Sequence, residues 1–421
     1  MKHRLIECCS KIGSGITPKG GDSVYVAAGV PLIRSQNVLD GAFSAEGLRY
    51  ITAEQHDRMS GSKVYPDDIL FNITGASIGR CCLLPAEMEE ANVNQHVCIV
   101  RLKGGFHAPF FAYVLSSKVA KRALHESQAG GGREGLNFKN LGDFKIYAPP
   151  LPEQKAIASV LQCWDNGISQ LEAKIAAKER VKKGLMQQLL SGQLRLSRFG
   201  EAGKWDKDEC QMPDGWRKMK LSQISNLTAG GTPSKTRPEY WGGEIPWMSS
   251  GDLNKKIVSE VSGRITELGL KKSSTKFIPK YSVLIGLAGQ GKTRGTVAVN
   301  NFELCTNQSV AAIIPDSSKA HYYFIYQNLE IRYDELRQLS AGDGGRGGLN
   351  LTLLGNLPIV LPSLEEQKAI VRVLSAADRE LDALRRKLEV WKVQKKYLLN
   401  NLVDGSIRLP EFVDTEKEVA G

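Results

Sequence analysis

The stretch that decides the fold is EQKAIASVLQCWDNGISQLEAKIAAKERVKKGLMQQLLSGQLRL, residues 153–196, because the chain contains it twice. It aligns without a gap on EQKAIVRVLSAADRELDALRRKLEVWKVQKKYLLNNLVDGSIRL, residues 366–409, at an offset of 213. Seventeen of the 44 aligned positions are identical, including the opening EQKAI, Asp165 with Asp378, Lys182-Lys183 with Lys395-Lys396, and Gly192 with Gly405. An internal repeat of this kind organises the whole fold.

The segments before the two blocks also match, more weakly and at nearly the same offset. The pairs are Thr17-Pro18 with Thr232-Pro233, VPLIRSQNV (30–38) with IPWMSSGDL (245–253), Asn94-Gln95 with Asn307-Gln308, and GGGREGLNF (130–138) with DGGRGGLNL (343–351). We therefore interpret the chain as one unit of about 200 residues used twice, each a globular head followed by a helical arm. Divergence is concentrated in the heads, as expected if the arms do a shared job and the heads different ones.

Both arms carry apolar residues that step alternately by four and three. They are Ile157, Leu161, Trp164, Ile168, Leu171 and Ile175 in the first arm and Ile370, Leu374, Ala377, Leu381, Leu384 and Leu388 in the second. This is the a/d seam of a heptad repeat, which needs a partner helix to cover it. The economical prediction packs the arms against each other, antiparallel. The alternative places each arm separately on its own head, although such a helix usually has a wider apolar stripe.

Local signals predict where the arm helices begin and end. Pro152 suits the first turn of one helix, and Ser363 with Glu366 forms a capping box for the other. Gly192 and Gly405 are placed as C-terminal stops. Helices of roughly 38 residues would be about 57 Å long.

The heads have a mixed α/β pattern with much strand. VYPDDILFNITG (64–75) and IPKYSVLIGLAG (278–289) predict strands that end in glycine, followed by return strands at CCLLP and TVAVN. Short helices are expected within 110–126 and 321–339. The predicted fold class is α+β: two mixed α/β domains related by an internal repeat and joined by two long antiparallel coiled-coil helices. The predicted boundaries are 1–150 for head 1, 151–196 for its arm, 197–213 for a linker, 214–362 for head 2, 363–409 for its arm and 410–421 for a tail.

Composition is that of an ordinary globular protein. The 421 residues are 42% hydrophobic and 24% charged, which excludes collagen-like and disordered classes. No window approaches the 18 or so apolar residues of a membrane span, and the N-terminus has no apolar run typical of a secretory signal. The net charge of +11 suggests a polyanionic partner without proving one. Glycine, at 42 residues, is in surplus.

The eight cysteines show no C-x-x-C spacing and no nearby paired histidines. We interpret them as reduced thiols of a cytoplasmic protein, which leaves a zinc site as the less favoured alternative.

Residues Gly286 to Thr293, GLAGQGKT, satisfy the P-loop pattern letter for letter. The pattern binds phosphate only when a helix follows it, and here glycine and β-branched residues follow that favour a strand. The corresponding stretch of head 1, NITGASIGR (72–80), lacks the pattern. A P-loop ATPase with a coiled-coil arm is therefore the alternative rather than the leading hypothesis.

The same glycine-rich loops suit DNA better, because a narrow projecting backbone with forked donors can reach base edges and phosphates. Amide side chains at Asn94-Gln95 and Asn307-Gln308 could read adenine. For each single residue a plain turn or a solvated charge is an equally good interpretation, but recurrence in both heads favours the set. The candidate DNA-binding residues are Arg34, Asn37, Ser77, Arg80, Asn94, Gln95, Arg133, Ser249, Gln290, Lys292, Thr293, Arg294, Asn307, Gln308 and Arg346.

Catalytic motifs are missing from the sequence. There is no Asp/Asn-Pro-Pro-aromatic motif of an adenine methyltransferase, no convincing G-x-G-x-x-G and no H-E-x-x-H. We predict no catalytic residues and no metal ligands.

At this point the sequence resembles a known family over nearly its whole length. Each head is followed by PLPEQKAIASVL or PSLEEQKAIVRVL, a helix, and a closing LLSGQLRL or LVDGSIRL. This arrangement resembles the specificity subunit of a Type I restriction-modification system. RPEYWGGEIPW (237–247) and NITGASIGR are also similar to what its target-recognition domains carry.

The resemblance implies a non-catalytic DNA-recognition subunit. Each head would recognise one half of a bipartite double-stranded DNA site, and the arms would set the spacer and dock two adenine-N6 methyltransferase subunits. Motor-nuclease subunits would join for restriction. S-adenosylmethionine, ATP and Mg would belong to those partners, and no cofactor or membrane contact is expected for this chain.

Overall fold

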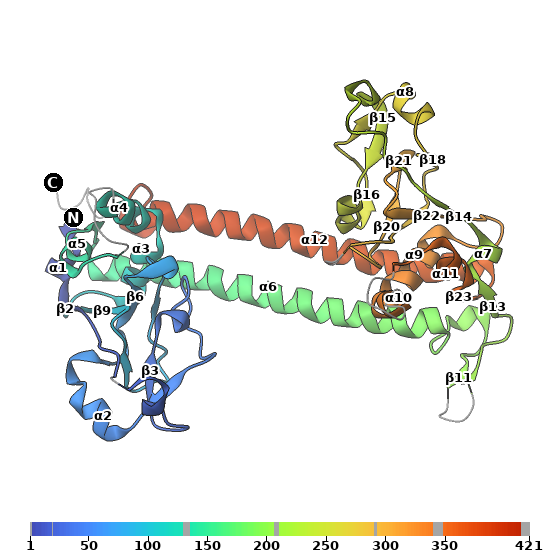
Figure 1. The fold of residues 1–421 in the computed structure, drawn as a ribbon. Coiled ribbons are helices and arrows are strands. Elements are labelled where there is room, and N and C mark those ends of the chain that lie inside the picture. The colour runs from blue at the N-terminus through green and yellow to red at the C-terminus, as the bar shows by residue number, and fades with distance from the viewer. Residues whose placement is uncertain are drawn as a thin grey trace. The chain divides into compact units, whose positions relative to one another are not determined.

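The computed structural model describes residues 2–18, 20–128, 135–205, 210–289, 293–339 and 348–413. It divides into two compact units (Figure 1). Unit 1 comprises Met1–Glu172 and Arg386–Gly421, and unit 2 comprises Ala173–Arg385. Each unit therefore combines one head with the beginning of its own arm and the end of the other arm.

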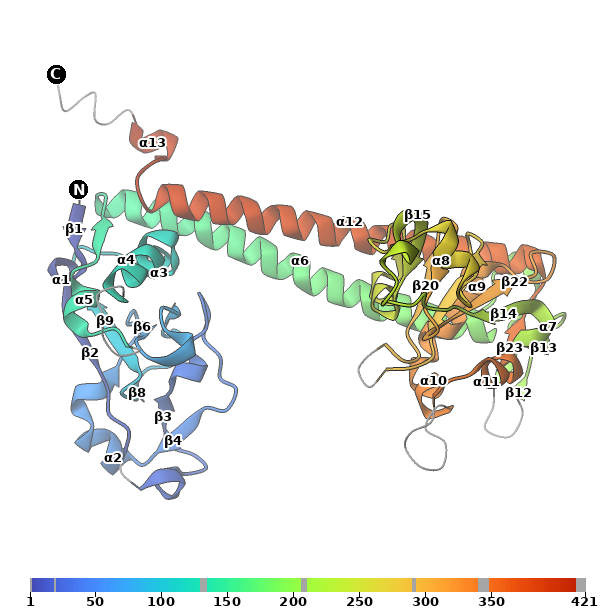
Figure 2. The same ribbon diagram turned by 45° about the horizontal axis from the view of Figure 1, so that its top comes forward.

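Head 1 contains two four-stranded sheets. The sheet nearer the long helices has the order β2-β9-β6-β7, and the other has the order β4-β3-β8-β5 (Figures 1 and 2). The strands are β2 (Cys9–Ser14), β3 (Val30–Ile33), β4 (Arg49–Ile51), β5 (Lys63–Val64), β6 (Ile69–Asn72), β7 (Cys81–Leu83), β8 (Ala91–Val93) and β9 (Val97–Leu102), with β1 (Lys2–Arg4) paired on β10 (Lys145–Tyr147). The helices are α1 (Leu5–Cys8), α2 (Ala53–Arg58), α3 (Ala108–Ser116), α4 (Lys118–Gln128) and α5 (Phe138–Gly142).

Head 2 repeats this plan, with sheets in the orders β14-β22-β19-β20-β16 and β17-β15-β21-β18. Its strands are β14 (Ser225–Ala229), β15 (Trp241–Met248), β16 (Ile257–Val258), β17 (Arg264–Ile265), β18 (Phe277–Ile278), β19 (Val283–Gly286), β20 (Val297–Asn300), β21 (Leu304–Thr306) and β22 (Val310–Pro315), with β13 (Arg217–Lys220) paired on β23 (Pro358–Leu361). The helices are α7 (Leu221–Ile224), α8 (Glu267–Lys271), α9 (Tyr322–Ile331), α10 (Tyr333–Leu339) and α11 (Leu351–Asn356). Outside the heads lie α13 (Pro410–Val413) and the pair β11 (Lys204–Trp205) and β12 (Cys210–Gln211).

The predicted hairpins are confirmed, but their strands are shorter than expected. Within 64–75 only β6 continues to the turn, and within 278–289 only β19 does. Asp67 and Tyr281 have φ of 69° and 66°, a left-handed backbone that interrupts an extended run just before each strand. β6 and β19 are buried at every residue. In each of these two segments, it is therefore the loop after the strand, and not the strand itself, that can contact a ligand.

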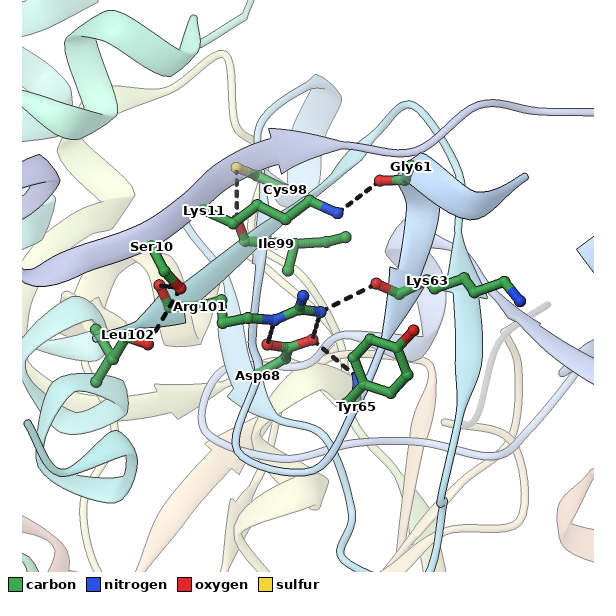
Figure 3. Close-up of polar contacts among 10 residues, drawn as sticks. All are labelled: Ser10, Lys11, Gly61, Lys63, Tyr65, Asp68, Cys98, Ile99, Arg101 and Leu102. Carbon is green, nitrogen blue, oxygen red and sulfur yellow. Dashed lines mark hydrogen bonds and ion pairs between the residues drawn. The ribbon is translucent and has the colours of Figure 1, made fainter. Parts of the chain in front are cut away.

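An arginine–carboxylate pair ties the two sheets of head 1 together (Figure 3). Arg101 of β9 donates from Nε and Nη2 to the two carboxylate oxygens of Asp68, both at 2.7 Å. Its Nη2 also donates to the carbonyl of Lys63 in β5 at 3.1 Å. The hydrogen bonds to Asp68 raise the pKa of Arg101. Because its donors serve the fold, Arg101 is not a DNA-contact candidate.

The arms form two single helices, α6 (Leu151–Ser191, 41 residues) and α12 (Leu364–Leu402, 39 residues). Ser363 Oγ accepts a hydrogen bond from the Glu366 backbone, which is one half of the predicted capping box. The Glu366 carboxylate accepts from Arg195 instead of closing the box. Gly192 follows α6 directly with φ of 80°, and Gly405 has φ of 77° beside the ring of Tyr147. Both positions therefore need glycine.

Ion pairs show that α6 and α12 run antiparallel in each unit. In unit 1, Lys392 pairs with Glu172 at 2.8 Å and Lys395 pairs with Asp165. In unit 2, Lys178 pairs with Glu380 at 2.9 Å and Lys182 pairs with Asp378. As residue numbers rise in one helix, those of the partner fall, which is the antiparallel register predicted from the heptads.

The apolar seam is covered as predicted, but partly by the heads. Ile157 and Leu161 lie in the core of head 1 together with Leu402 of α12, and Ile370 and Leu374 lie in the core of head 2. Within unit 1, Trp164 packs edge-on against Trp391, with ring centroids 6.0 Å apart. None of the twelve seam residues is exposed. Each arm therefore supports both its partner helix and its own head.

Candidate nucleic-acid interface

Three loops of head 1 that the sequence singled out separately meet at one place. The turn after β6 is joined to the loop before β9, because the Ile73 backbone N–H donates to the carbonyl of His96 at 3.1 Å. The segment that follows the glycine-rich stretch is joined to the same turn, because Leu136 N–H donates to the carbonyl of Ile73 at 2.8 Å. Thr74 Oγ1 and His96 Nδ1 add a side-chain contact of 2.7 Å.

Head 2 makes the same two backbone hydrogen bonds at the positions that the repeat predicts. Leu287 N–H donates to the carbonyl of Ser309 at 2.8 Å, and Leu349 N–H donates to the carbonyl of Leu287 at 3.1 Å. The donors and acceptors lie 213 or 214 residues after those of head 1. One backbone frame thus holds three loops together in each head, whereas the residues of the hairpin turn differ between the heads.

A hydrogen bond between side chains also recurs at the edge of this frame. Thr17 Oγ1 donates to Gln95 Oε1 in head 1, and Thr232 Oγ1 donates to Gln308 Oε1 in head 2. Both glutamines are exposed. The hydroxyl holds each amide by its oxygen, which leaves the amide nitrogen as the donor. In head 1 the Gln95 nitrogen also contacts His96 Nε2 at 3.3 Å.

The candidate residues differ in how available they are. Arg80, Gln95 and Gln308 are exposed; Arg34, Ser77, Ser249, Thr293, Arg294 and Asn307 are partly buried; Asn37 and Asn94 are buried. Arg133, Gln290, Lys292 and Arg346 lie outside the described residues.

Two candidates use their side chains for hydrogen bonds within head 1. Asn37 is fully buried; its oxygen accepts from the Arg34 backbone, and its nitrogen donates to the carbonyls of Ser44 and Glu46. The Asn94 oxygen accepts from the backbone N–H of the residue two positions on, His96, at 3.1 Å. We therefore do not carry Asn37 or Asn94 into the interface.

The paired amides were predicted to act together on adenine, and the structure separates their roles. Asn307 makes the same turn-stabilising bond as its counterpart in head 1, because its oxygen accepts from the Ser309 backbone at 3.2 Å. The glutamine that follows each asparagine is the exposed member of the pair. Asparagine shapes the turn, and glutamine presents a donor.

Hydrogen bonds also correct the matching of the hairpin turns. Asn72 N–H donates to the carbonyl of Arg80 in head 1, and Gly286 N–H donates to the carbonyl of Thr296 in head 2, at 2.8 and 3.0 Å. Thr296 therefore takes the place of Arg80, and the turn of head 2 is two residues longer (296 − 286 against 80 − 72). The sequence alignment had missed these two extra residues.

The P-loop pattern has no P-loop context. The described residues after Thr293 turn into strand β20, which pairs antiparallel with β19. A phosphate-binding P-loop needs a helix whose N-terminal amides face the phosphates. The ATPase alternative is therefore unsupported.

Sequence reasoning missed a pocket of about 540 Å³ in head 2. Its wall includes Trp241 and Trp247, whose rings meet edge to face at 88°. The remaining lining residues are Thr232, Lys235, Ser249, Asn307 and Gln308. Trp247 could have been noted from IPWM, where head 1 has VPLI.

Other kinds of site are not found in the part of the chain that the structure describes. No group of histidine, cysteine and acidic side chains there could hold a metal ion. Cys8, Cys9, Cys81, Cys82, Cys98 and Cys305 are buried free thiols, and Cys163 is an exposed one. Within the same residues no helix has the length and apolar character needed to cross a membrane.

Fold and site together define a two-headed α+β protein built from an internal repeat on paired helices. The family model described as the Type I restriction modification DNA specificity domain matches residues 29–179 and 213–390. The chain belongs to this family, the specificity subunits of Type I restriction-modification systems.

Individual relatives agree over almost the full length. The chain is 23% identical over 425 residues to a putative type I restriction enzyme MjaX specificity subunit of Methanocaldococcus jannaschii, covering 97% of this chain and 93% of that protein. One solved structure concerns complex assembly and conformational transition of the type I R-M system. Its matching chain has a TM-score of 0.62 at 19% identity, and the match covers 97% of this chain and 98% of that chain. The Type-I restriction-modification S subunit from M. genitalium has a TM-score of 0.56 at 15% identity, with 96% of each chain covered. At these identities the two solved structures support the fold.

Proposed function

We propose that this chain reads a bipartite, asymmetric double-stranded DNA site, with one half-site for each head. Membership of a family of non-catalytic DNA-specificity subunits supports this function. The observation that carries it is the frame of three loops, which recurs in both heads with the same backbone hydrogen bonds. A shared frame with different side chains suits two readers that present the same geometry to different sequences.

The side chains offered by the frame suit this task in part. Arg80 is exposed at the turn of head 1, and its guanidinium pairs with no carboxylate among the described residues. Gln95 and Gln308 present amide donors. Arginine and amide donors bond to base edges in the major groove, chiefly to guanine O6 and N7 and to adenine N7.

The partners follow from the same proposal. Two adenine-N6 methyltransferase subunits would dock on the paired helices and would methylate an adenine in each half-site after flipping it out of the stack. Motor-nuclease subunits would join for restriction. S-adenosylmethionine, ATP and Mg would bind to those subunits, and the assembly would act on DNA in the cytoplasm.

The experiment is co-expression of the chain with its partner methyltransferase, followed by mapping of methylated adenines in the host genome. We expect one bipartite motif with a constant gap. Arg80→Ala should then relax the requirement in one half-site and Arg294→Ala in the other, by about 1–3 kcal/mol of base discrimination each. Methylation without a bipartite motif, or losses spread evenly over all sequences, would contradict the assignment of one head to each half-site.

A further inference from the structure

We propose that the tryptophan pocket of head 2 binds one unstacked nucleobase of the DNA, which the Trp241 and Trp247 rings hold by stacking. The inference rests on the proposed function and deepens it, because it assigns a class of ligand to one site of head 2. The pocket has a volume of about 540 Å³, within the range of about 300–1,000 Å³ usual for small-molecule sites.

The two indoles are fixed in place and offer only their rings. Trp241 Nε1 donates to the carbonyl of Ser234 at 3.1 Å, and Trp247 Nε1 donates to the carbonyl of Gly231 at 3.0 Å. With both N–H groups used, what remains for a ligand is aromatic surface. The ring centroids are 5.1 Å apart and the planes are nearly perpendicular, so a planar ligand can stack on one ring while it meets the other.

The other side of the pocket is polar and carries donors. Gln308 is held through its oxygen by Thr232, so its N–H groups are available to the pocket. Asn307 uses its oxygen in the turn and likewise retains its amide nitrogen. Lys235 lies at the rim, exposed, and none of the described carboxylates forms an ion pair with it. A nucleobase carries acceptors for the amides, and its phosphate is a partner for the ammonium group.

The aromatic wall favours an unstacked base over a base within the duplex. Bases in a duplex expose only their edges in the grooves, because their faces are covered by neighbouring pairs. Stacking on an aromatic side chain becomes available only when a base has left the stack. A groove reader would need the amides and the lysine but not the indoles.

Among the described residues of head 1, the positions that match the pocket do not form an aromatic wall. The residue that corresponds to Trp247 is Leu32, which is fully buried, and Ser249 corresponds to Arg34, whose Nη2 donates to the carbonyl of Gly47 at 2.8 Å. The threonine–glutamine contact is common to both heads, whereas within the described residues the tryptophan pair is found in head 2. The two heads therefore treat their half-sites differently.

The test measures equilibrium binding of the full chain, without other subunits, to duplexes that carry its selected site with a single mispair at each position in turn. A mispair lowers the cost of unstacking a base. We expect binding to tighten about tenfold at one position of one half-site and to weaken or stay unchanged elsewhere. Trp247→Leu and Ser249→Arg, which give the pocket the residues of head 1, should each abolish that gain.

Ser249→Arg is the second pocket variant, because it changes a partly exposed lining residue without replacing either indole. It removes the contact of the Ser249 hydroxyl with Asp252 at 3.4 Å but keeps the backbone hydrogen bond to the same carboxylate. Phe277→Leu is the matched control, since Phe277 is an exposed aromatic residue of head 2 outside the pocket and should retain the tenfold gain. Sequence-specific binding without a gain at any position, or a gain that persists in both pocket variants, would overturn the pocket assignment alone. Loss of all sequence preference in the unmodified chain would overturn the proposed function itself.

Discussion

Arg408 forms a bidentate ion pair with Glu153, in which its Nε and Nη2 donate to the two carboxylate oxygens at 3.0 and 2.8 Å. The carboxylate is only 1% exposed. Unit 2 repeats the pair with Arg195 and Glu366, at 2.9 and 3.0 Å, and the hydrogen bonds to Glu366 raise the pKa of Arg195. Glu153 corresponds to Glu366 in the repeat, and Arg195 corresponds to Arg408. The same contact is therefore present in both units, and in each unit one arm supplies the glutamate and the other arm the arginine.

Replacement of this arginine should destabilise the protein strongly. Arg408→Met leaves the Glu153 carboxylate buried without its partner, a situation that costs about 3–5 kcal/mol. Arg195→Met should have a similar effect in unit 2. Urea unfolding followed by tryptophan fluorescence measures the loss. Arg58→Met is the control, because Arg58 and Glu54 form an exposed pair whose removal should cost less than about 1 kcal/mol. An equal decrease in the free energy of unfolding in all three variants would contradict the importance of burial.

The arms were predictable because their heptad spacing and end signals are local in sequence. The partners of the charged residues that the two arms share were not predictable. Asp165 and Lys395 are 230 residues apart, and no sequence pattern states that the identical positions of the repeat pair with each other across the helices. Likewise, the contribution of Ile157 and Leu161 to the core of head 1 depends on tertiary packing that a heptad pattern cannot specify.

The site was predictable as a set of loops but not residue by residue. Recurrence identified the three loops, and the structure brings their described parts together. Composition alone cannot separate Asn37, whose amide is consumed inside the head, from Gln308, whose amide faces outward. The role of Trp247 was hidden because an aromatic residue in a strand is usually part of a core.

The threonine hydroxyl beside each glutamine should contribute to base discrimination through the amide it holds. Thr232→Val keeps the shape of the side chain but removes the donor to Gln308 Oε1, so the amide can rotate and its N–H groups lose their fixed direction. A hydrogen bond worth about 0.5–1.5 kcal/mol corresponds to a two- to tenfold loss of discrimination. Binding to a panel of single-base variants of the site measures it.

The effect should fall on one half-site, and Thr17→Val should affect the other. Thr236→Val is the control, because Thr236 is exposed and its hydroxyl contacts only Ser234 among the described residues. A loss of overall affinity without a change in base preference would indicate that the threonine stabilises the loop and does not orient a reader.

The buried thiols should resist modification and make the fold sensitive to alkali. Burial raises the pKa of Cys8 and Cys305 to about 11 and the pKa of Cys9, Cys82 and Cys98 to about 12. In the unfolded chain thiols ionise near pH 8.5, so the stabilisation from these protonated thiols is complete below that pH and is lost as the pH rises toward 11 and 12. Pulse labelling with iodoacetamide at pH 8.5 should modify exposed Cys163 before these buried thiols. Equal labelling of all thiols in the native protein would contradict their burial.

The lengths of α6 and α12 should set the gap between the half-sites, if the paired helices act as the spacer that the proposed function requires. Insertion of one heptad into each helix preserves the a/d seam and adds about 10 Å to each rod. At 3.4 Å per base pair, the preferred gap should lengthen by about three base pairs, whereas the half-site sequences stay the same. Binding selection from a randomised duplex pool gives both quantities in one measurement.

Insertion into α6 alone is the matched control. With one helix longer than the other, the ion pairs of unit 1, Glu153–Arg408 and Asp165–Lys395, cannot form together with those of unit 2. This variant should therefore lose stability without producing a new gap. A doubly extended chain that folds, binds both half-sites and retains the original gap would show that some other part of the molecule fixes the spacing.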